Sequence, residues 1–243
     1  LPDHAHSINI VTINCRSVTN KLPELYAICH ANKPTIICLT ETWLSPSLLF
    51  SVPGYTCFRK DRSTHKNLRS NLRGYGGVAI LIRDGTFPHC TRRHDLDSPQ
   101  SEALWLELGA PAGLRANPLL ICCHYRPPSQ SLLDITSFCD ILTDTLCSLD
   151  LSLFDVFLTG DYNAHNSDWW SGDTTSRAGT ELSHVFSSFG LQQLVNFPTR
   201  VAPNGRLSCL DLLATNRPLS VRSVDDAAPL AASDHLQVIT TLA

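Results

Sequence analysis

Short apolar runs rich in Ile, Val, Leu and Phe recur along the chain, separated by polar residues or by Pro and Gly. Runs of this length that are bounded by turn residues predict buried β-strands. The expected strands are Ile8–Cys15, Thr35–Thr40, Gly54–Arg59, Gly77–Arg83, Ala103–Leu108, Leu119–Tyr125, Asp155–Gly160, Arg206–Ala214 and Leu236–Leu242.

Three segments have apolar residues at helical spacing instead. They are Lys21–Ala31, Ile135–Leu149 and Thr180–Phe189, the last of which is followed by Gly190, a residue that commonly ends helices. Strands this numerous, mixed with helices, do not suit one parallel sheet. We therefore expect an α/β fold of two packed sheets covered by helices, in a single domain.

Two connecting segments have a distinctive composition. Asn204-Gly205 lies between Val201 and Leu207, and this pair predicts a hairpin with a two-residue turn, because both turn residues need positive φ. The stretch 62–75 carries four basic residues and no acidic one, and we interpret it as a mobile surface loop.

Composition narrows the classes of protein that remain. The chain has 243 residues, of which 43% are hydrophobic and 17% charged, and this excludes an intrinsically disordered chain. The longest apolar runs are too short to cross a bilayer, so no membrane partner is expected. A net charge of −3 does not by itself indicate a polyanion binder. Because the chain has no Met, we expect it to be a piece of a longer polypeptide.

The ten cysteines are scattered and form no Cys-x-x-Cys pair, so a zinc site is not favoured. Cys38 and Cys122 lie within apolar runs, where free Cys behaves as a small hydrophobic residue. We expect reduced core cysteines in an intracellular protein. Trp43 and Trp105 are also expected in the core, and the pairs Cys122-Cys123 and Trp169-Trp170 are expected to serve packing.

Polar side chains stand at or near the ends of the predicted strands. They are Asn14, Glu41, Tyr125, Asp161, Asn163, Asp211, Asp234 and His235. Ligand sites in α/β sheets commonly gather at one set of strand ends. One such residue alone is more often the start of a solvated loop, but their repetition from strand to strand predicts a site.

The residue types in this set suit phosphodiester hydrolysis. Glu41 is a hard oxygen ligand for Mg²⁺. Asp161 can hold and deprotonate an attacking water, and Asn163 can fix that water or a phosphate oxygen. His235, charged and braced by Asp211, can neutralise a pentacoordinate phosphate. The chain has neither a Gly-x-Ser-x-Gly elbow nor a Walker loop.

Six motifs carry a resemblance to a known superfamily. In chain order they are Ile13-Asn14-Cys15-Arg16-Ser17, Leu39-Thr40-Glu41-Thr42-Trp43-Leu44, Tyr125-Arg126-Pro127-Pro128, Gly160-Asp161-Tyr162-Asn163-Ala164-His165, Cys209-Leu210-Asp211-Leu212 and Ser233-Asp234-His235. They resemble the exonuclease–endonuclease–phosphatase superfamily, which includes deoxyribonuclease I and the apurinic/apyrimidinic endonucleases. Within it, the motifs are most similar to the endonuclease domain of non-LTR (LINE-type) retrotransposons. The residues around Glu41 and before Asp211 differ from those of repair-type enzymes, which does not favour abasic-site specificity.

The resemblance implies a deoxyribonuclease I-like two-sheet α/β sandwich of four layers, and a role for each matched residue. Glu41 would hold Mg²⁺, or Mn²⁺ in its place, with Asn14 beside it. Asp161 and Asn163 would activate the water. Tyr125 would contact the scissile phosphate or the leaving oxygen. His235 and Asp211 would stabilise the phosphate, and Asp234 would assist the metal or the histidine. Ser208 would have a secondary role.

The implied activity is that of a Mg²⁺-dependent DNA endonuclease that nicks one strand and leaves a 3′-hydroxyl to prime reverse transcription at the target. Residues 1–243 would form one endonuclease domain from the N-terminal part of a polyprotein that acts in the nucleus. Its partners would be double-stranded DNA and the reverse transcriptase domain of the same polyprotein. The alternatives are a phosphatase or sphingomyelinase-type phosphodiesterase, and a catalytically inactive DNA-targeting module. The expected DNA contacts are Arg62, Lys66, Arg69 and Arg73 of the basic loop, Asn204 of the hairpin tip and Ser208.

Overall fold

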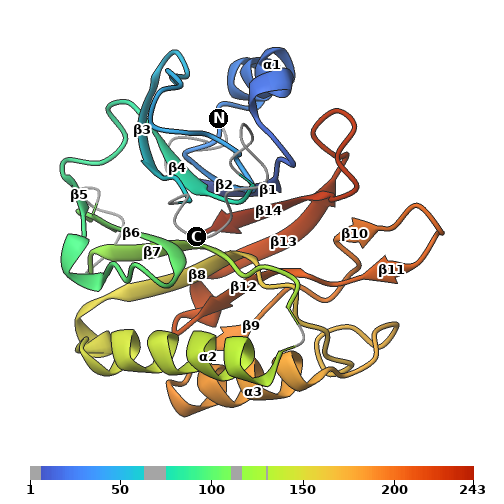
Figure 1. Ribbon diagram of the computed structural model, residues 1–243. Helices are drawn as coiled ribbons and strands as arrows, with labels where there is room; N and C mark the ends of the chain where they lie inside the picture. The colour runs from blue at the N-terminus through green and yellow to red at the C-terminus, as the bar shows by residue number, and fades with distance from the viewer. Residues whose placement is uncertain (1–6, 63–74, 111–116, 130) are drawn as a thin grey trace.

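A computed structural model describes residues 7–62, 75–110, 117–129 and 131–243, and Figure 1 shows its layers. Within these ranges two six-stranded sheets pack against each other. Helix α1 (Leu22–Asn32) covers the outer face of the first sheet. Helices α2 (Leu132–Cys147) and α3 (Arg177–Ser188) cover the outer face of the second. The predicted four-layer α/β sandwich is confirmed.

The first sheet has the strand order β13-β14-β1-β2-β4-β3. Its strands are β1 (Ile8–Asn14), β2 (Ile36–Thr40), β3 (Tyr55–Lys60), β4 (Val78–Arg83), β13 (Val221–Ala227) and β14 (Gln237–Leu242). β1 and β2 run parallel, whereas β14 and β4 flank this pair in the antiparallel direction. A short 3₁₀ helix, Thr19–Lys21, precedes α1 in the connection from β1 to β2.

The second sheet has the order β5-β6-β7-β8-β12-β9. Its strands are β5 (Cys90–Arg92), β6 (Glu102–Leu108), β7 (Leu119–Tyr125), β8 (Asp155–Asp161), β9 (Gln192–Gln193) and β12 (Asp211–Thr215). β7 and β8 are parallel and are connected through α2, whereas β12 runs antiparallel to β8. Three further 3₁₀ turns cover His94–Leu96, Leu151–Leu153 and Pro218–Ser220.

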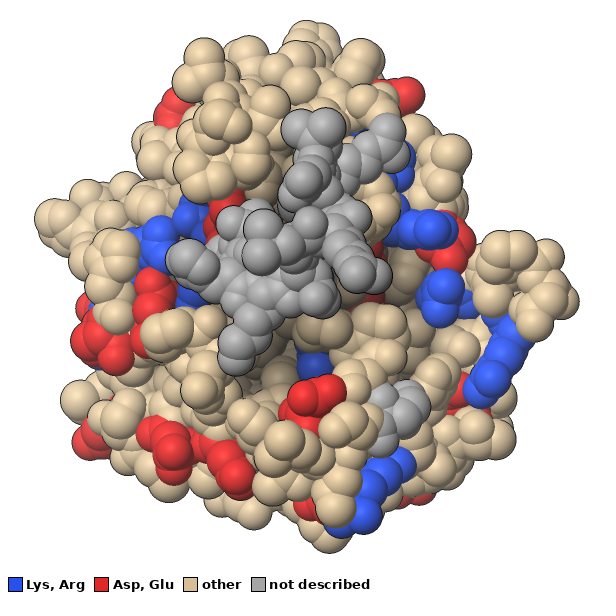
Figure 2. Space-filling view, viewed as in Figure 1, with Lys and Arg blue, Asp and Glu red and all other residues tan. Residues whose placement is uncertain are grey.

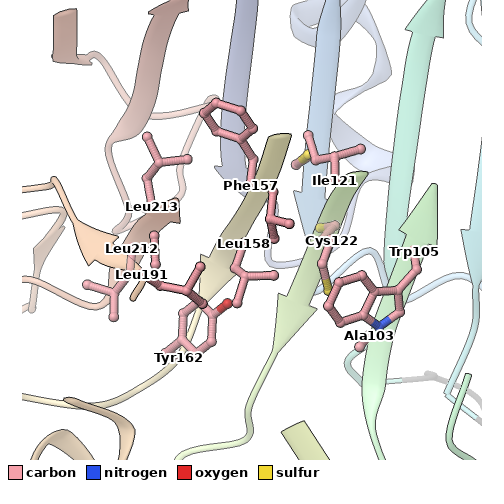
Figure 3. Packing of buried hydrophobic residues seen from close by; sticks show 14 of the residues in the cluster. Ala103, Trp105, Ile121, Cys122, Phe157, Leu158, Tyr162, Leu191, Leu212 and Leu213 are labelled. Atoms are coloured by element: carbon pink, nitrogen blue, oxygen red, sulfur yellow. The ribbon is translucent and has the colours of Figure 1, made fainter. Parts of the chain in front are cut away.

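Alternation along the strands produces the layered core, because successive side chains of a strand point to opposite faces. In β2, Ile36 and Cys38 join the central cluster between the sheets, whereas Ile37 and Leu39 join a second cluster beneath α1. The central cluster continues through the second sheet to the faces of α2 and α3. Figure 3 shows part of it, including Trp105 and Tyr162.

The predicted segments correspond to strands and helices of the structure, with shifts of a few residues at their ends. α3 begins earlier than predicted, at Arg177, because the Ser176 side chain accepts a hydrogen bond from the Gly179 amide and caps the helix. The sequence analysis missed β5, β9, β10 (Arg200–Val201) and β13. β9 and β10 are very short, and β13 is a half-exposed strand at the sheet edge that contains Asp225 and Asp226.

The prediction of one continuous strand over Arg206–Ala214 is wrong. The structure has β11 (Leu207–Ser208) and β12, separated at Cys209 and Leu210. The break has a physical cause, because backbone amides at this point bond to side chains instead of to a neighbouring strand. The Cys209 amide donates to Asp173 Oδ2 (2.9 Å), and the Leu210 amide donates to Thr199 Oγ1 (3.0 Å).

The predicted hairpin is present, but its turn differs from the one expected. β10 (Arg200–Val201) pairs with β11, and the hairpin projects from the body of the molecule (Figure 1). The Gly205 amide donates to the Ala202 carbonyl (2.8 Å), and of Asn204 and Gly205 only Gly205 has positive φ. The connection is therefore a longer turn that ends on a left-handed glycine, not a two-residue turn.

Most cysteines lie in the core, as predicted. All ten are free thiols; Cys57 and Cys90 are half-buried, and Cys147 is exposed. Trp105 is buried, and Trp169 and Trp170 pack against the central cluster. The prediction for Trp43 is wrong, because its ring is half-buried and lies next to Glu41. Among the described residues, no helix combines the length and the apolar character needed to span a bilayer.

Gly160 is a position in the fold where a side chain does not fit. It has φ of +135°, and a Cβ added there would lie 1.9 Å from the His124 carbonyl oxygen of β7. Gly190, at φ of +63°, has open space around it. We expect Gly190→Ala to cost about 1 kcal/mol through backbone strain alone. Gly160→Ala should cost about 3 kcal/mol or more, because a steric clash adds to the strain.

Urea unfolding of the two variants measures this difference in the free energy of unfolding. Equal losses at Gly160 and Gly190 would contradict the close approach of β7 and β8 at this point.

Candidate active site

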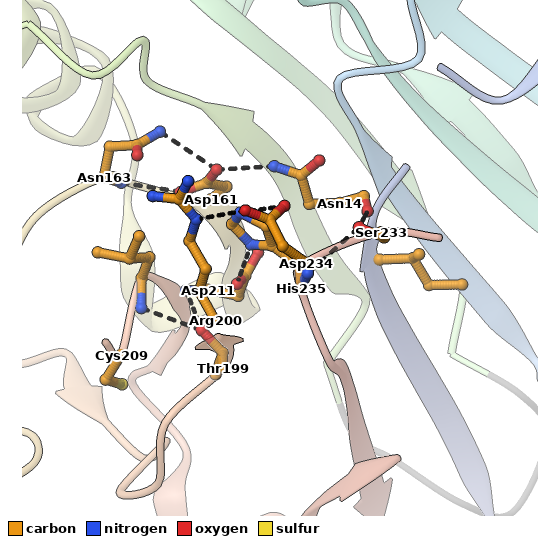
Figure 4. A network of polar contacts seen from close by, with 12 residues as sticks. Asn14, Asp161, Asn163, Thr199, Arg200, Cys209, Asp211, Ser233, Asp234 and His235 are labelled. Atoms are coloured by element: carbon orange, nitrogen blue, oxygen red, sulfur yellow. Dashed lines mark hydrogen bonds and ion pairs between the residues drawn. The ribbon is translucent and has the colours of Figure 1, made fainter. Parts of the chain in front are cut away.

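Strand polarity brings the predicted polar residues to one edge of the sandwich. β1 and β2 end at this edge, as do β7 and β8, while the antiparallel strands β12 and β14 begin there. Asn14 therefore meets Asp161 across the two sheets, and Asp211 pairs with Asp161 within the second sheet. Figure 4 shows that these side chains form one polar network.

Asn14 bridges two carboxylates. Its Nδ2 donates to Glu41 Oε1 (3.0 Å) and to Asp161 Oδ2 (2.8 Å). The other oxygen of Glu41 accepts a hydrogen bond from the Trp43 indole nitrogen (3.2 Å). Asn163 donates its backbone amide to Asp161 Oδ1 (2.9 Å). These donors fix the orientation of both carboxylates.

Asp161 is only 1% exposed, and its environment changes its acidity. Burial and, after it, the neighbouring charge of Asp211 raise the pKa of the Asp161 carboxyl to about 7, although His235 acts in the opposite direction. A carboxyl group with this pKa exchanges its proton near neutral pH, which is the requirement for a general base.

His235 and Asp211 form a buried pair, with Nδ1 2.7 Å from Oδ2. Burial alone would lower the pKa of His235, but the charge and hydrogen bond of Asp211, together with the Asp161 charge, raise it to about 9. The imidazole is therefore protonated at neutral pH. Its Nδ1–H donates to Asp211, so its Nε2–H is the donor that remains for an anion.

The carboxylates of the site suit a divalent cation. Donor atoms of Asp161, Asp211 and His235 lie within 4.8 Å of one another, and Asn14 links Glu41 to this group. Asp211 Oδ1 is buried and has no hydrogen-bond partner among the described residues. Because His235 Nδ1 already bonds Asp211, we expect the carboxylate oxygens to be the ligands, which are the ligands that Mg²⁺ prefers.

Tyr125 ends β7 opposite Asp161 and is buried. Burial, followed by the charges of Glu41 and Asp161, holds the pKa of the Tyr125 phenol far above its ordinary value, so the hydroxyl remains a donor. The guanidinium of Arg62 lies 5.7 Å from the centroid of the Tyr125 ring, and its Nε donates to Glu102 Oε1 (2.6 Å). Arg62 is thus placed beside the site.

The other predicted DNA contacts have different outcomes. Asn204 is exposed at the hairpin tip, where its side chain accepts the Arg206 amide. Ser208 is only 6% exposed in β11, and its contact with DNA stays a prediction. Lys66, Arg69 and Arg73 lie outside the described residues.

Asp234 adjoins the site but has partners that the sequence analysis did not expect. Its Oδ1 lies 2.9 Å from Arg16 Nη1 and 4.0 Å from His235 Nε2, and its Oδ2 lies 2.9 Å from Arg200 Nε. The nearest ion-pair partners of Asp234 are thus two arginines that were not among the candidate residues.

Several supporting residues were also missed. Thr199 Oγ1 accepts the amides of Leu210 and Asp211, both at 3.0 Å, and so fixes the start of β12. Arg126 is buried and donates to the carbonyls of Tyr162 and Asn163, which holds the turn after Asp161. Arg126 belongs to the Tyr-Arg-Pro-Pro motif, so its position in that motif was the available signal.

A second histidine–aspartate pair, His165 and Asp173, stabilises the segments next to the active site. His165 Nδ1 lies 2.8 Å from Asp173 Oδ1, and Asp173 Oδ2 accepts the Cys209 amide (2.9 Å). His165 was not a candidate site residue, and the structure pairs it with Asp173 and not with the catalytic candidates. The pair connects the segment after Asn163 to the segment before Asp211.

Sharp backbone turns direct the side chains at the strand ends into the site. Arg16, Glu41 and Asn163 have φ of 40°, 50° and 44°, in the left-handed region that non-glycine residues seldom adopt. The turn at Glu41 is held by hydrogen bonds from the Thr42 and Trp43 amides to the carbonyls of Gly77 and Gly76. Such strained residues concentrate at functional sites, where the surrounding structure enforces them.

Comparison with known proteins finds a matching family model and several structures of similar fold. Residues 119–239 match the model of the family described as Endonuclease-reverse transcriptase. The endonuclease domain of TRAS1, a telomere-specific non-LTR retrotransposon, superposes with a TM-score of 0.77 at 17% identity, covering 98% of this chain and 98% of that one. The AP endonuclease LMAP from Leishmania major gives a TM-score of 0.79 at 17% identity, covering 99% of this chain and 89% of that one.

A third similar structure is the 3′ phosphatase NExo from Neisseria bound to a product DNA hairpin, with a TM-score of 0.69 at 18% identity and coverage of 97% and 99%. A search of curated proteins finds no match. The shared fold and the family match over part of the chain agree with the resemblance seen in the sequence. Its residues 119–239 carry the signature of the endonuclease–reverse transcriptase family.

The charge of His235 depends on Asp211, which allows a direct test. We expect an NMR titration of the His235 ring to have its midpoint near 9 in the wild-type protein. Asp211→Asn removes the charge that offsets burial, so the midpoint should fall well below this value. The resonance is assigned by its loss in His235→Gln. An unchanged midpoint in Asp211→Asn would show that Asp211 does not hold the proton on His235.

Proposed function

We propose that the protein is a Mg²⁺-dependent DNA endonuclease that nicks one strand of its target. The observation that carries the proposal is the convergence of Glu41, Asp161, Asp211 and His235 at one edge of the sandwich, with Asn14 bridging the carboxylates. A carboxyl group that ionises near neutral pH can act as a general base, and a protonated imidazole beside it can stabilise the charge that develops in phosphodiester hydrolysis.

In the proposed reaction, Asp161 orients a water molecule and accepts its proton as the water oxygen attacks phosphorus. Asn163 holds the Asp161 carboxylate in the direction of that water. His235 donates Nε2–H to a phosphate oxygen and stabilises the charge of the pentacoordinate transition state. Mg²⁺ at Glu41 would supply further stabilisation of the negative charge on the phosphate and the leaving oxygen.

The bond between phosphorus and the 3′ oxygen breaks in this scheme, and the departing 3′ oxygen takes a proton from the solvent. The Tyr125 hydroxyl, which stays protonated, contacts the phosphate or the departing oxygen. The products are a 3′-hydroxyl and a 5′-phosphate on one strand of a duplex whose other strand stays intact. A 3′-hydroxyl is the end that a polymerase extends.

We further propose that this end primes reverse transcription at the target, with the chain acting as the endonuclease domain of a longer retrotransposon polyprotein. The support is the family description, which joins endonuclease and reverse transcriptase, and the likeness to the TRAS1 endonuclease domain. The reverse transcriptase domain of the same polyprotein would then use the nicked strand directly.

Nicking of supercoiled plasmid, measured with and without Mg²⁺, tests the proposal. We expect open-circular product only with Mg²⁺ or Mn²⁺. Glu41→Gln should reduce the rate about 100-fold or more, because it removes a charged metal ligand. Glu24→Gln, at an exposed position of α1, is the matched control and should nick at the wild-type rate.

The nicked product is then given to a DNA polymerase without end repair. Direct extension is expected if the 3′ oxygen leaves as a hydroxyl. A plasmid that stays supercoiled while a phosphomonoester is hydrolysed would favour a phosphatase, and no metal-dependent hydrolysis of either substrate would favour an inactive targeting module.

A further inference from the structure

Two arginines from distant parts of the chain meet on one carboxylate beside the site. Arg16 follows β1 and Arg200 begins β10, and both bond Asp234 at 2.9 Å through different oxygens. Their side chains are 46% and 37% exposed, whereas Asp234 is 11% exposed. The guanidinium groups therefore lie at the surface, and the carboxylate that joins them lies beneath.

Each guanidinium retains most of its donors. Arg16 bonds Asp234 through Nη1 only, and Arg200 bonds it through Nε only. Within the described residues neither guanidinium makes another hydrogen bond, although each carries five N–H donors. Arg126 is different, because it is buried and uses Nε, Nη1 and Nη2 on backbone carbonyls. Arg126 serves the fold, whereas Arg16 and Arg200 have donors left for a ligand.

The location of the pair indicates which ligand. Asp234 Oδ1, which bonds Arg16, is also 4.0 Å from His235 Nε2, the donor that faces the scissile phosphate in the proposed reaction. Arg200 lies opposite His235 in an isolated antiparallel bridge. The two guanidinium groups and the Asp234 carboxylate together carry one net positive charge, which lies next to the His235 imidazolium. In Figure 2 basic side chains also gather on the flank from which the β10–β11 hairpin projects.

We propose that Arg16 and Arg200, held by Asp234, form a binding site for the phosphates of the DNA backbone that flank the scissile phosphate. This inference rests on the proposed function. Arginine suits such a role because its planar fork matches phosphate oxygens and stays charged. Phosphate contacts carry no sequence information but fix the position of the duplex, so this site determines which phosphate lies on His235.

Backbone hydrogen bonds attach the segments that carry the two arginines to residues of the active site. The Arg16 amide donates to Asn14 Oδ1 (3.1 Å), and the Val201 amide donates to the Asp234 carbonyl (2.9 Å). The two arginines are thereby attached to the same residues that orient Asp161 and His235. A phosphate bound by these arginines is therefore held at a defined position relative to Asp161 and His235.

Binding of a labelled duplex in EDTA, which prevents cleavage, is measured against salt concentration for Arg16→Ser, Arg200→Ser, the double variant and Arg16→Lys. Log affinity falls as log salt concentration rises. Each Ser variant should make this slope less steep by roughly one, and the double variant by roughly two. Arg16→Lys should keep the wild-type slope, because the charge remains.

Arg217→Ser is the matched control. Arg217 bonds Asp155 through Nε at 3.0 Å with 45% of its side chain exposed, but Asp155 begins β8, at the opposite end of that strand from Asp161. This variant should bind DNA with the wild-type slope.

Wild-type slopes in Arg16→Ser and Arg200→Ser would overturn the inference. So would a loss in Arg16→Ser that Arg16→Lys shares, since that result would indicate a structural role. In plasmid nicking, the losses should appear mainly in KM, because each single variant leaves Asp234 one arginine partner. A wild-type protein that neither binds nor nicks DNA would instead contradict the proposed function itself.

Discussion

The side-chain amide of Asn14 is the contact on which the active edge depends. β1 belongs to one sheet and β8 to the other, and the two are joined there by the Asn14–Asp161 hydrogen bond (2.8 Å) and, one step inward, by the hydroxyls of Thr12 and Thr159 (2.7 Å). Without the amide, Glu41 and Asp161 would present two carboxylates to each other without a shared donor. The amide supplies that donor to both carboxylates.

The network around Asn14 gives different pKa values to groups that lie within a few ångströms of one another. Burial and the Asp211 charge raise the pKa of Asp161 to about 7, while Asp211 and Asp161 together overcome burial and raise that of His235 to about 9. Between these two values one group is free to accept a proton and the other still carries one. The same packing that buries the site therefore produces a base and an acid from adjacent side chains.

Sequence reasoning was most accurate where a pattern is local. β7 has the predicted bounds, Leu119–Tyr125, because a short apolar run bounded by proline residues favours a buried strand. It failed where a residue's environment is set by distant segments. The break between β11 and β12, before Asp211, depends on contacts with Thr199 and Asp173, and no local sequence pattern predicts those contacts. The partners of Asp234, Arg16 and Arg200, come from two other segments of the chain, and no local pattern predicted them either.

The central claim is that Asp161 acts as the base and that protonated His235 stabilises the transition state in hydrolysis of a DNA strand. The rate of plasmid nicking under single-turnover conditions, followed from about pH 5 to about pH 10, tests it most directly. The rate should rise through about pH 7 as Asp161 loses its proton, and fall above about pH 9 as His235 loses its own. A rate that continues to rise beyond the ionisation of His235, or that does not change with pH, would contradict these assignments.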